Sequence, residues 1–180
     1  MMNLKKIKII AIVGIFLLSF PAHFLYKLFP NLLTSILFPV NESIFEHMKI
    51  IYTSTLIYGI IDYYFLKRNN IIYANFLFQL FLTSFISITF YLILYLPIHY
   101  LIGEKLIISI LLLLITYIFS QIISYSILKH PHIPYLNTLA IPLIILIYII
   151  FILLTYFPPN YYLFYDTTTN SYGNPKKHIN

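Results

Sequence analysis

Long apolar runs fill most of this 180-residue chain and constrain its fold more than any other feature. A helix needs about 20 mainly apolar residues to cross a bilayer. Inside hydrocarbon, each backbone amide must be satisfied within its own segment, which a helix achieves and an open sheet does not. We therefore predict an all-α, polytopic membrane helix bundle of about five transmembrane helices, with candidate spans at 8–27, 44–66, 71–97, 105–128 and 136–157.

Composition agrees with lipid as the surrounding medium. Hydrophobic residues make up 61% of the chain and charged residues 9%, against roughly 25% charged residues in a soluble domain. The net charge is +6, but the basic residues flank apolar runs and form no stripe on a soluble surface. We therefore expect the lipid bilayer as a partner and exclude nucleic acid. The chain has no cysteine, so disulfides and thiolate metal sites are excluded as well.

The flanking charges also predict an orientation. Two parts are expected: a five-helix transmembrane domain at 1–157 and an extracytoplasmic C-terminal tail at 158–180. With the N-terminus in the cytoplasm and the C-terminus outside, six basic residues fall inside and five outside, and the positive-inside rule favours that arrangement in a cell membrane. Those inside are Lys5, Lys6, Lys8, Lys67, Arg68 and Lys129. Proline bounds the spans, with Pro97 expected to end the third helix.

Most of the acidic residues gather on the predicted outer face, around the start of the second span. Asn41 is expected to cap that helix. At 100° per residue, Glu42, Glu46 and Lys49 share one face, whereas His47 lies on another. Two carboxylates one turn apart repel each other unless a cation or proton lies between them.

Three hypotheses account for this cluster. It is a capped helix start in which Lys49 neutralises the two carboxylates. Alternatively, Glu42 and Glu46 bind a divalent metal together with His99, His23 or Asp166, all on the outer face, and such donors suit zinc or manganese. In the third hypothesis, the same residues handle protons or a polar substrate in a bundle cavity. Two interpretations of the tail stay open: it is an ordinary disordered terminus, or it covers the Glu42 region and supplies Asp166 or Tyr172.

The helix start and the tail carry a family resemblance. The segment Pro39 to Lys49 resembles the pattern Pro-Val-Asn-Glu-Ser-x-Trp-Glu-His-x-Lys of a family of small bacterial multi-pass membrane proteins of unknown function, with Phe45 in the tryptophan place. The family's tail pattern, Asp-Pro-x-Thr-Gly-x-Tyr-Gly, is matched at Asp166, Thr169, Tyr172 and Gly173, with Thr167 and Asn170 replacing proline and glycine. The resemblance implies a membrane protein and supplies no activity.

We expect an integral membrane protein with a polar, outward-facing site and a binding or transport-related role for a small molecule or ion. One alternative is a metal-dependent hydrolase or transferase at the outer interface, with Glu42 or Glu46 as metal ligand or general base and His47 or His99 assisting. Another is a structural accessory protein. The cofactor, a divalent metal or none, and the oligomeric state stay open. An enzyme requires the outer carboxylates and histidines to converge on one cleft, whereas a carrier requires a polar path inward past Thr53, Ser84 or Gln121.

Overall fold

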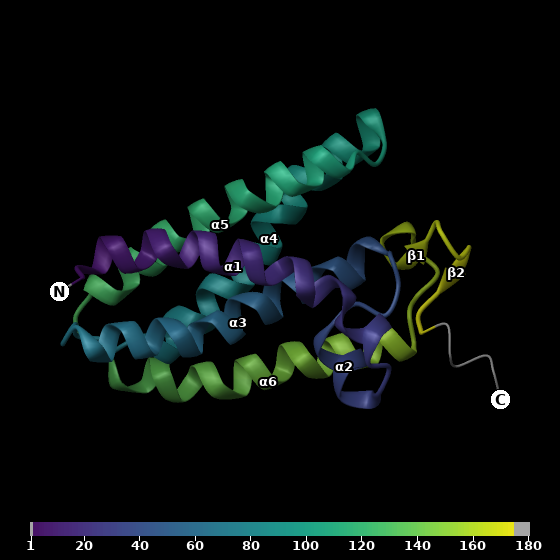
Figure 1. Cartoon of the computed structure of the whole chain (residues 1–180). Helices are drawn as coiled ribbons and strands as arrows, with labels where there is room; N and C mark the ends of the chain where they lie inside the picture. The colour runs from purple at the N-terminus through teal and green to yellow at the C-terminus, as the bar shows by residue number, and fades with distance from the viewer. Residues whose placement is uncertain (1, 175–180) are drawn as a thin grey trace.

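Five long helices run back and forth along one axis, and a short helix and a small hairpin lie at one end (Figure 1). The computed structural model describes residues 2–174. The rest of the predicted tail, 175–180, lies outside the described residues. The elements are α1 (Leu4–Leu28), α2 (Leu32–Leu37), α3 (Ile44–Arg68), α4 (Phe76–Ile102), α5 (Leu106–Lys129), α6 (Pro134–Tyr156), η1 (Tyr162–Phe164), β1 (Tyr165–Asp166) and β2 (Ser171–Tyr172). The predicted all-α helix bundle is confirmed.

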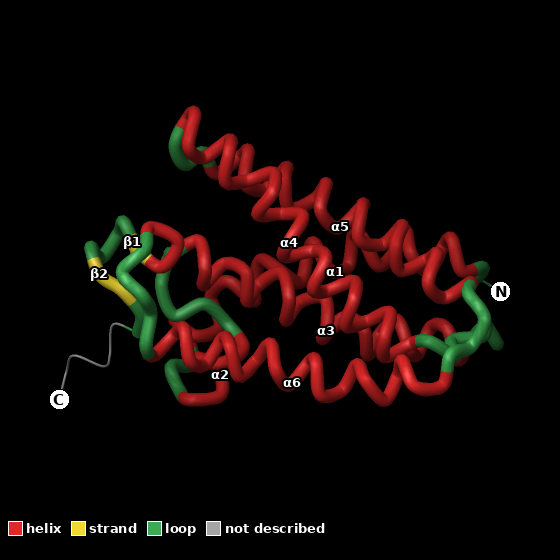
Figure 2. Tube along the Cα trace, turned by 180° about the vertical axis from the view of Figure 1, so that it is seen from behind, coloured by secondary structure: helices red, strands yellow, loops and turns green. Residues whose placement is uncertain are grey.

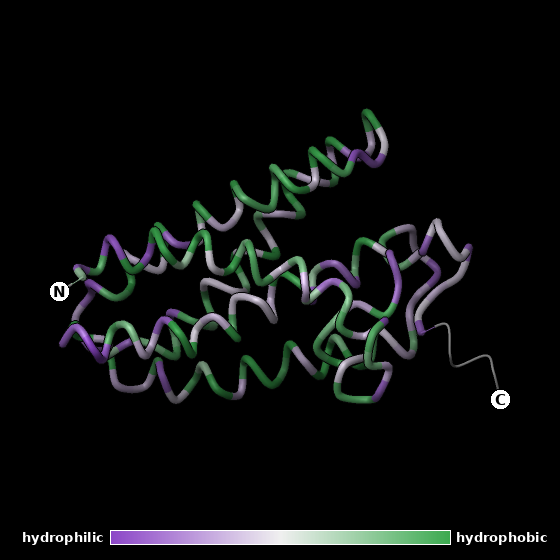
Figure 3. The backbone as a smooth tube through the Cα atoms, in the orientation of Figure 1, coloured by the Kyte–Doolittle hydropathy of each residue, from purple (hydrophilic) through white to green (hydrophobic). Residues whose placement is uncertain are grey.

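Four of the helices, α1, α4, α5 and α6, are long and apolar enough to cross a membrane, as expected of a multi-pass membrane protein. Apolar residues follow α5 and α6, and hydrophilic residues concentrate at the two ends of the bundle (Figure 3). The fifth predicted span, α3, has 25 residues but is more polar. It packs between α1 and α4, and its charged residues Glu46, Lys49 and Asp62 are buried. Neighbouring helices therefore shield those charges from lipid.

We call the end of the bundle that holds residues 29–43, 103–105 and 157–174 the tail end. Loops and the two short strands gather there (Figure 2). Two boundaries near this end differ from prediction. The cap of α3 is Ser43, whose hydroxyl accepts the Glu46 N–H at 3.3 Å, so the prediction of Asn41 was wrong. Helix α4 also runs past Pro97 to Ile102, because a membrane helix tolerates an interior proline when neighbouring groups satisfy the freed carbonyl.

A buried ion pair holds the tail end together. The Lys49 ammonium lies 2.8 Å from Glu46 Oε2 and donates to the Ser35 carbonyl on α2, also at 2.8 Å. Glu46 also accepts the Val40 N–H at 2.9 Å and the Thr155 hydroxyl of α6 at 2.8 Å. The two side chains are 0% and 1% exposed. The pair therefore ties α2, α3 and α6 together.

A second buried pair, Lys8 with Asp62, joins α1 to α3 near the opposite end. Both side chains are almost fully buried. One carboxylate oxygen of Asp62, Oδ1, has no hydrogen-bond partner among the described residues. The carboxylate of this pair therefore has fewer hydrogen-bond partners than the Glu46 carboxylate at the tail end.

The residues after α6 fold back over the loop before α3. Strands β1 and β2 pair antiparallel, with Tyr165 opposite Tyr172 and Asp166 opposite Ser171. We call residues 165–173 the tail hairpin. It ends at Gly173, which has φ +69°, and a Cβ there would lie 2.8 Å from the Thr155 carbonyl oxygen. Glycine is thus required both by the backbone conformation and by the close approach to α6.

Candidate functional site

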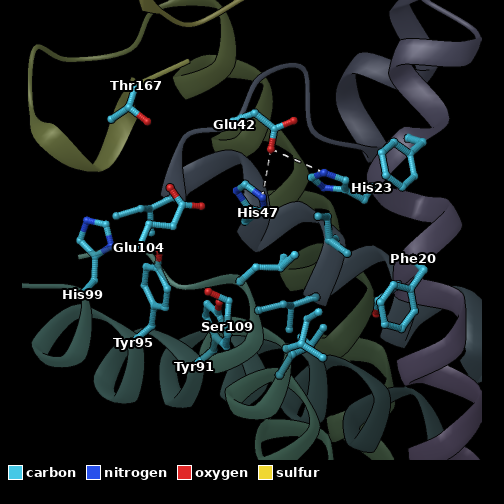
Figure 4. A pocket seen from close by; sticks show the side chains of 18 of the residues that line it. Phe20, His23, Glu42, His47, Tyr91, Tyr95, His99, Glu104, Ser109 and Thr167 are labelled. Atoms are coloured by element: carbon cyan, nitrogen blue, oxygen red, sulfur yellow. Dashed lines mark hydrogen bonds and ion pairs between the residues drawn. The ribbon is translucent and has the colours of Figure 1, made fainter. Parts of the chain in front are cut away.

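A cavity of about 360 Å³ opens at the tail end, between α1, the start of α3 and the ends of α4 and α5 (Figure 4). Part of the tail hairpin borders its mouth. Most of its wall is apolar, but titratable side chains gather near the mouth. They are His23 on α1, Glu42 and His47 at the start of α3, His99 on α4 and Glu104 in the α4–α5 turn.

Three of these side chains converge. Glu42 Oε2 lies 3.5 Å from His23 Nε2 and 3.5 Å from His47 Nε2, and all three ligand atoms lie within 4.8 Å of one another. Figure 4 shows both imidazoles directed at this carboxylate. We call the three residues the His–Glu–His cluster. Its members come from two helices and a loop, and the two imidazole rings stack with their centroids 5.2 Å apart.

The tautomer of His47 follows from its backbone contact. Its Nδ1 lies 2.8 Å from the carbonyl oxygen of Ser43. A carbonyl only accepts hydrogen bonds, so Nδ1 carries the proton and the neutral ring has its lone pair on Nε2. That lone pair faces the Glu42 carboxylate, which is also an acceptor. Two acceptors facing each other favour a cation or a proton between them.

The spacing of the cluster fits a metal ion. Zinc binds imidazole nitrogen and carboxylate oxygen at about 2.0–2.2 Å, so two tetrahedral ligands lie about 3.4 Å apart. The Glu42–His23 and Glu42–His47 separations of 3.5 Å match that value, and all three ligand atoms lie within 4.8 Å of one another. A metal-binding histidine also typically donates its other N–H to a backbone carbonyl or a carboxylate, as His47 does to Ser43. Two imidazoles and one carboxylate leave a fourth position for water or substrate.

The tail hairpin fixes the backbone on either side of Glu42. The Asn41 side-chain amide donates to the Gly173 carbonyl at 2.8 Å, and its oxygen accepts the Ser43 N–H at 2.9 Å. The Asp166 carboxylate accepts the backbone N–H of Glu42. The helix-start pattern and the tail pattern, which lie more than 100 residues apart in the chain, therefore meet beside the cluster.

The contacts of Asp166 favour the ionised form of its carboxyl group. Burial raises the pKa of its carboxyl group, but hydrogen bonds from Thr168, Thr169 and the Glu42 backbone outweigh burial and hold the pKa below its ordinary value. The Thr168 and Thr169 hydroxyls lie 2.7 Å and 2.8 Å from its oxygens. Tyr172, the other tail residue expected at the site, instead packs against the Tyr165 ring within the tail hairpin.

The other candidate ligands lie elsewhere. The Glu46 carboxylate is buried against Lys49, away from the His–Glu–His cluster, so Glu42 and Glu46 do not share a site. His99 lines the same cavity, but its Nδ1 lies 3.1 Å from the Tyr95 hydroxyl and its Nε2 lies 2.8 Å from the Tyr162 hydroxyl. The structure thus brings Glu42, His47 and His23 together, and it leaves Glu46 and His99 outside that group.

Several polar lining residues were not among the candidates from the sequence. Among them, Glu104 lines the cavity from the α4–α5 turn and Ser109 lines it from α5. Glu104 follows Gly103, which has φ +72° and ends α4. The sequence did hold a signal for Glu104, because it is an acidic residue in a tight turn between two apolar spans.

Comparison with known proteins places the chain in a family. A family model described as a family of unknown function (DUF6512) matches residues 1–174. The chain belongs to this family. The DUF6512 match spans all six helices and the tail hairpin, so the cavity and the cluster both fall within it. No curated protein and no solved structure matches the chain.

Proposed function

We propose that this protein is a metal-dependent membrane enzyme, a hydrolase or transferase that works at the outer membrane interface. The observation that supports this is the convergence of His23, Glu42 and His47 at the mouth of a cavity. A divalent ion with three protein ligands and one open position lowers the pKa of a bound water to about 7. The ligand chemistry suits zinc best.

The facing wall provides groups for proton transfer. Glu104 and His99 line the same cavity as the cluster, and Figure 4 shows Glu104 between His99 and the cluster. A metal ion held by His23, Glu42 and His47 would supply an activated water as the nucleophile for hydrolysis. Glu104 would accept the proton of that water as its oxygen bonds to the carbonyl carbon or phosphorus, and the leaving oxygen would take up a proton as its bond breaks.

A carrier is less well supported by the same observations. A path across the bundle requires polar lining that continues inward past Thr53, Ser84 or Gln121, and none of these three belongs to the cavity lining. Thr53 and Ser84 instead donate to backbone carbonyls, Thr53 to Leu37 at 2.7 Å. The lining of this cavity therefore supports a binding role at the tail end of the bundle.

Metal content of the purified protein tests the proposal. We expect near-stoichiometric zinc in detergent-purified protein after zinc loading and washing, measured by inductively coupled plasma mass spectrometry. His23→Ala, Glu42→Ala and His47→Ala should each lose most of it, because each removes one of three ligands. His99→Ala is the matched control, since it removes a histidine from the same cavity outside the cluster, and it should keep the metal. Metal-free wild type, or equal retention in all four variants, would refute the proposal.

A further inference from the structure

We propose that the cavity binds a single-chain membrane amphiphile with an anionic headgroup, whose apolar chain lies between α1 and α5. The headgroup part of this proposal rests on the proposed metal site, because it places the headgroup oxygens at the fourth position of the ion. The chain part rests on the cavity alone. The two parts are therefore separable by experiment.

The charged side chains of the cavity lie at its mouth, and its deeper wall is mostly apolar apart from the hydroxyls of Ser19 and Tyr91. Glu42 and Glu104 belong to loops at the tail end, whereas Leu113 lies seven residues into α5 and Ile51 seven residues into α3. At 1.5 Å per residue, those side chains lie about 10 Å below the mouth. The lower wall therefore reaches roughly a third of the way through a hydrocarbon layer of about 30 Å. A polar end above an apolar end matches the chemistry of an amphiphile.

The cavity also opens sideways, toward the surroundings of the bundle. Phe20 and Phe24 on α1 and Leu106 on α5 line it, yet they are 41%, 49% and 74% exposed. Both whole-chain views show the tail-end halves of α4 and α5 leaning away from α1 (Figures 1 and 2). A molecule already dissolved in the bilayer can therefore enter between α1 and α5 without passing through water.

The volume of the cavity and the charge of the proposed metal site limit which ligand can bind. A volume of about 360 Å³ lies near the lower limit of the roughly 300–1,000 Å³ range of small-molecule sites, which favours one chain over two. A divalent cation held by one carboxylate and two neutral imidazoles keeps a local net positive charge at its open coordination position, although Glu104 lines the same mouth. Phosphate or carboxylate oxygens are hard donors that neutralise it. The substrate class of the proposed enzyme is thus a single-chain anionic lipid.

Tryptophan quenching tests this inference, because the natural chain has no tryptophan. Phe20→Trp places a fluorophore in the cavity wall. Leu17→Trp is the matched control, since Leu17 lies one turn away on α1, is 59% exposed and does not line the cavity. The full chain would be placed in phosphatidylcholine nanodiscs, and dodecyl phosphate brominated at the chain end would be titrated. We expect saturable quenching of Phe20→Trp and weak, non-saturating quenching of Leu17→Trp.

Competition separates the chain from the headgroup. Unbrominated dodecyl phosphate should displace the probe at least about tenfold better than butyl phosphate, because each buried methylene contributes about 0.8 kcal/mol. Equal quenching of the two variants would mean simple partitioning into the bilayer and would overturn the inference. Equal displacement by butyl phosphate or inorganic phosphate would overturn it too, since the site would then bind headgroups only.

A third arm distinguishes this inference from the proposed function. His47→Ala combined with Phe20→Trp should bind the probe more weakly and should lose the preference for dodecyl phosphate over neutral dodecanol. If the wild type holds no metal but Phe20→Trp is still quenched saturably, the enzyme proposal and the headgroup part of this inference fail, and the binding of the apolar chain stands. If metal is bound but quenching does not saturate, the amphiphile site fails and the metal site stands.

Discussion

The carboxylate of Glu46 lies 2.8 Å from the ammonium group of Lys49, and both side chains are shielded from solvent. Removing one partner of such a pair leaves the other charge buried and unpaired, at a cost of about 3–5 kcal/mol. We expect Glu46→Ala to lower the free energy of unfolding by that amount and to reduce the thermal midpoint measured in detergent. Glu42→Ala should change it by no more than about 0.5 kcal/mol, since the Glu42 side chain is 47% exposed. Equal losses of stability in the two variants would contradict a stabilising role that belongs to Glu46 and not to Glu42.

The Lys8–Asp62 pair predicts a different pattern. Lys8→Met should destabilise the protein, because Asp62 then keeps a buried negative charge and already has an unpartnered Oδ1. Lys8→Met combined with Asp62→Leu should recover most or all of the loss, since apolar side chains often replace a buried ion pair without cost. The double-mutant cycle of thermal midpoints measures the coupling. Additive losses would show that the pair is not energetically linked.

Two glycines with positive φ provide a matched test of the tail hairpin. Gly103 and Gly173 have φ +72° and +69°, so alanine is strained at both. A Cβ at Gly103 meets nothing within 4 Å, whereas a Cβ at Gly173 approaches the Thr155 carbonyl and Pro158. We expect Gly173→Ala to destabilise the protein more than Gly103→Ala and to increase proteolysis within residues 165–173. The reverse order would argue against the packing of this hairpin on α6.

Asp166 makes the hairpin sensitive to acid. Hydrogen bonds hold its pKa below the ordinary value in the folded protein, so its stabilising contribution is present above the ordinary carboxyl pKa and is lost as pH falls through the lowered folded value. Asp166→Asn should lower the thermal midpoint at neutral pH. The difference between wild type and Asp166→Asn should shrink below about pH 4. A difference independent of pH would exclude the ionised carboxylate as the cause.

The absence of natural cysteine allows the orientation to be measured directly. Lys105 and Lys67 are both exposed lysines, at the tail end and the opposite end of the bundle. If the tail end faces outward, a membrane-impermeant maleimide added to intact cells should label Lys105→Cys and leave Lys67→Cys unlabelled until the cells are opened. The opposite pattern would place the cavity on the cytoplasmic side and would refute an outer-interface enzyme.

The sequence predicted the helices well because long apolar runs leave the backbone few alternatives in lipid. It failed at the start of α3 for a local reason. The helix begins at Ile44, so Glu42 lies outside it and the angular spacing that placed Glu42 and Glu46 on one face does not apply. The Glu42 carboxylate faces the cavity, whereas the Glu46 carboxylate faces Lys49.

Partners from distant elements were harder to predict. His23 was one of several candidate ligands, and only the packing of α1 against α3 brings its imidazole to Glu42. The contact of Asn41 with Gly173 likewise depends on the path of the chain after α6. No spacing rule within one helix or hairpin encodes such contacts, because they are set by how the helices pack.

The connection between the tail hairpin and the loop before α3 also sets an order of events during synthesis. Glu42 emerges from the ribosome early, but the groups that hold its backbone, Asp166 and Gly173, are made after all six helices. The His–Glu–His cluster therefore matures last, once the chain has inserted and its final residues have reached the same side of the membrane. We expect a chain cut before residue 165 to keep its helices and to lack the contacts that hold the backbone around Glu42.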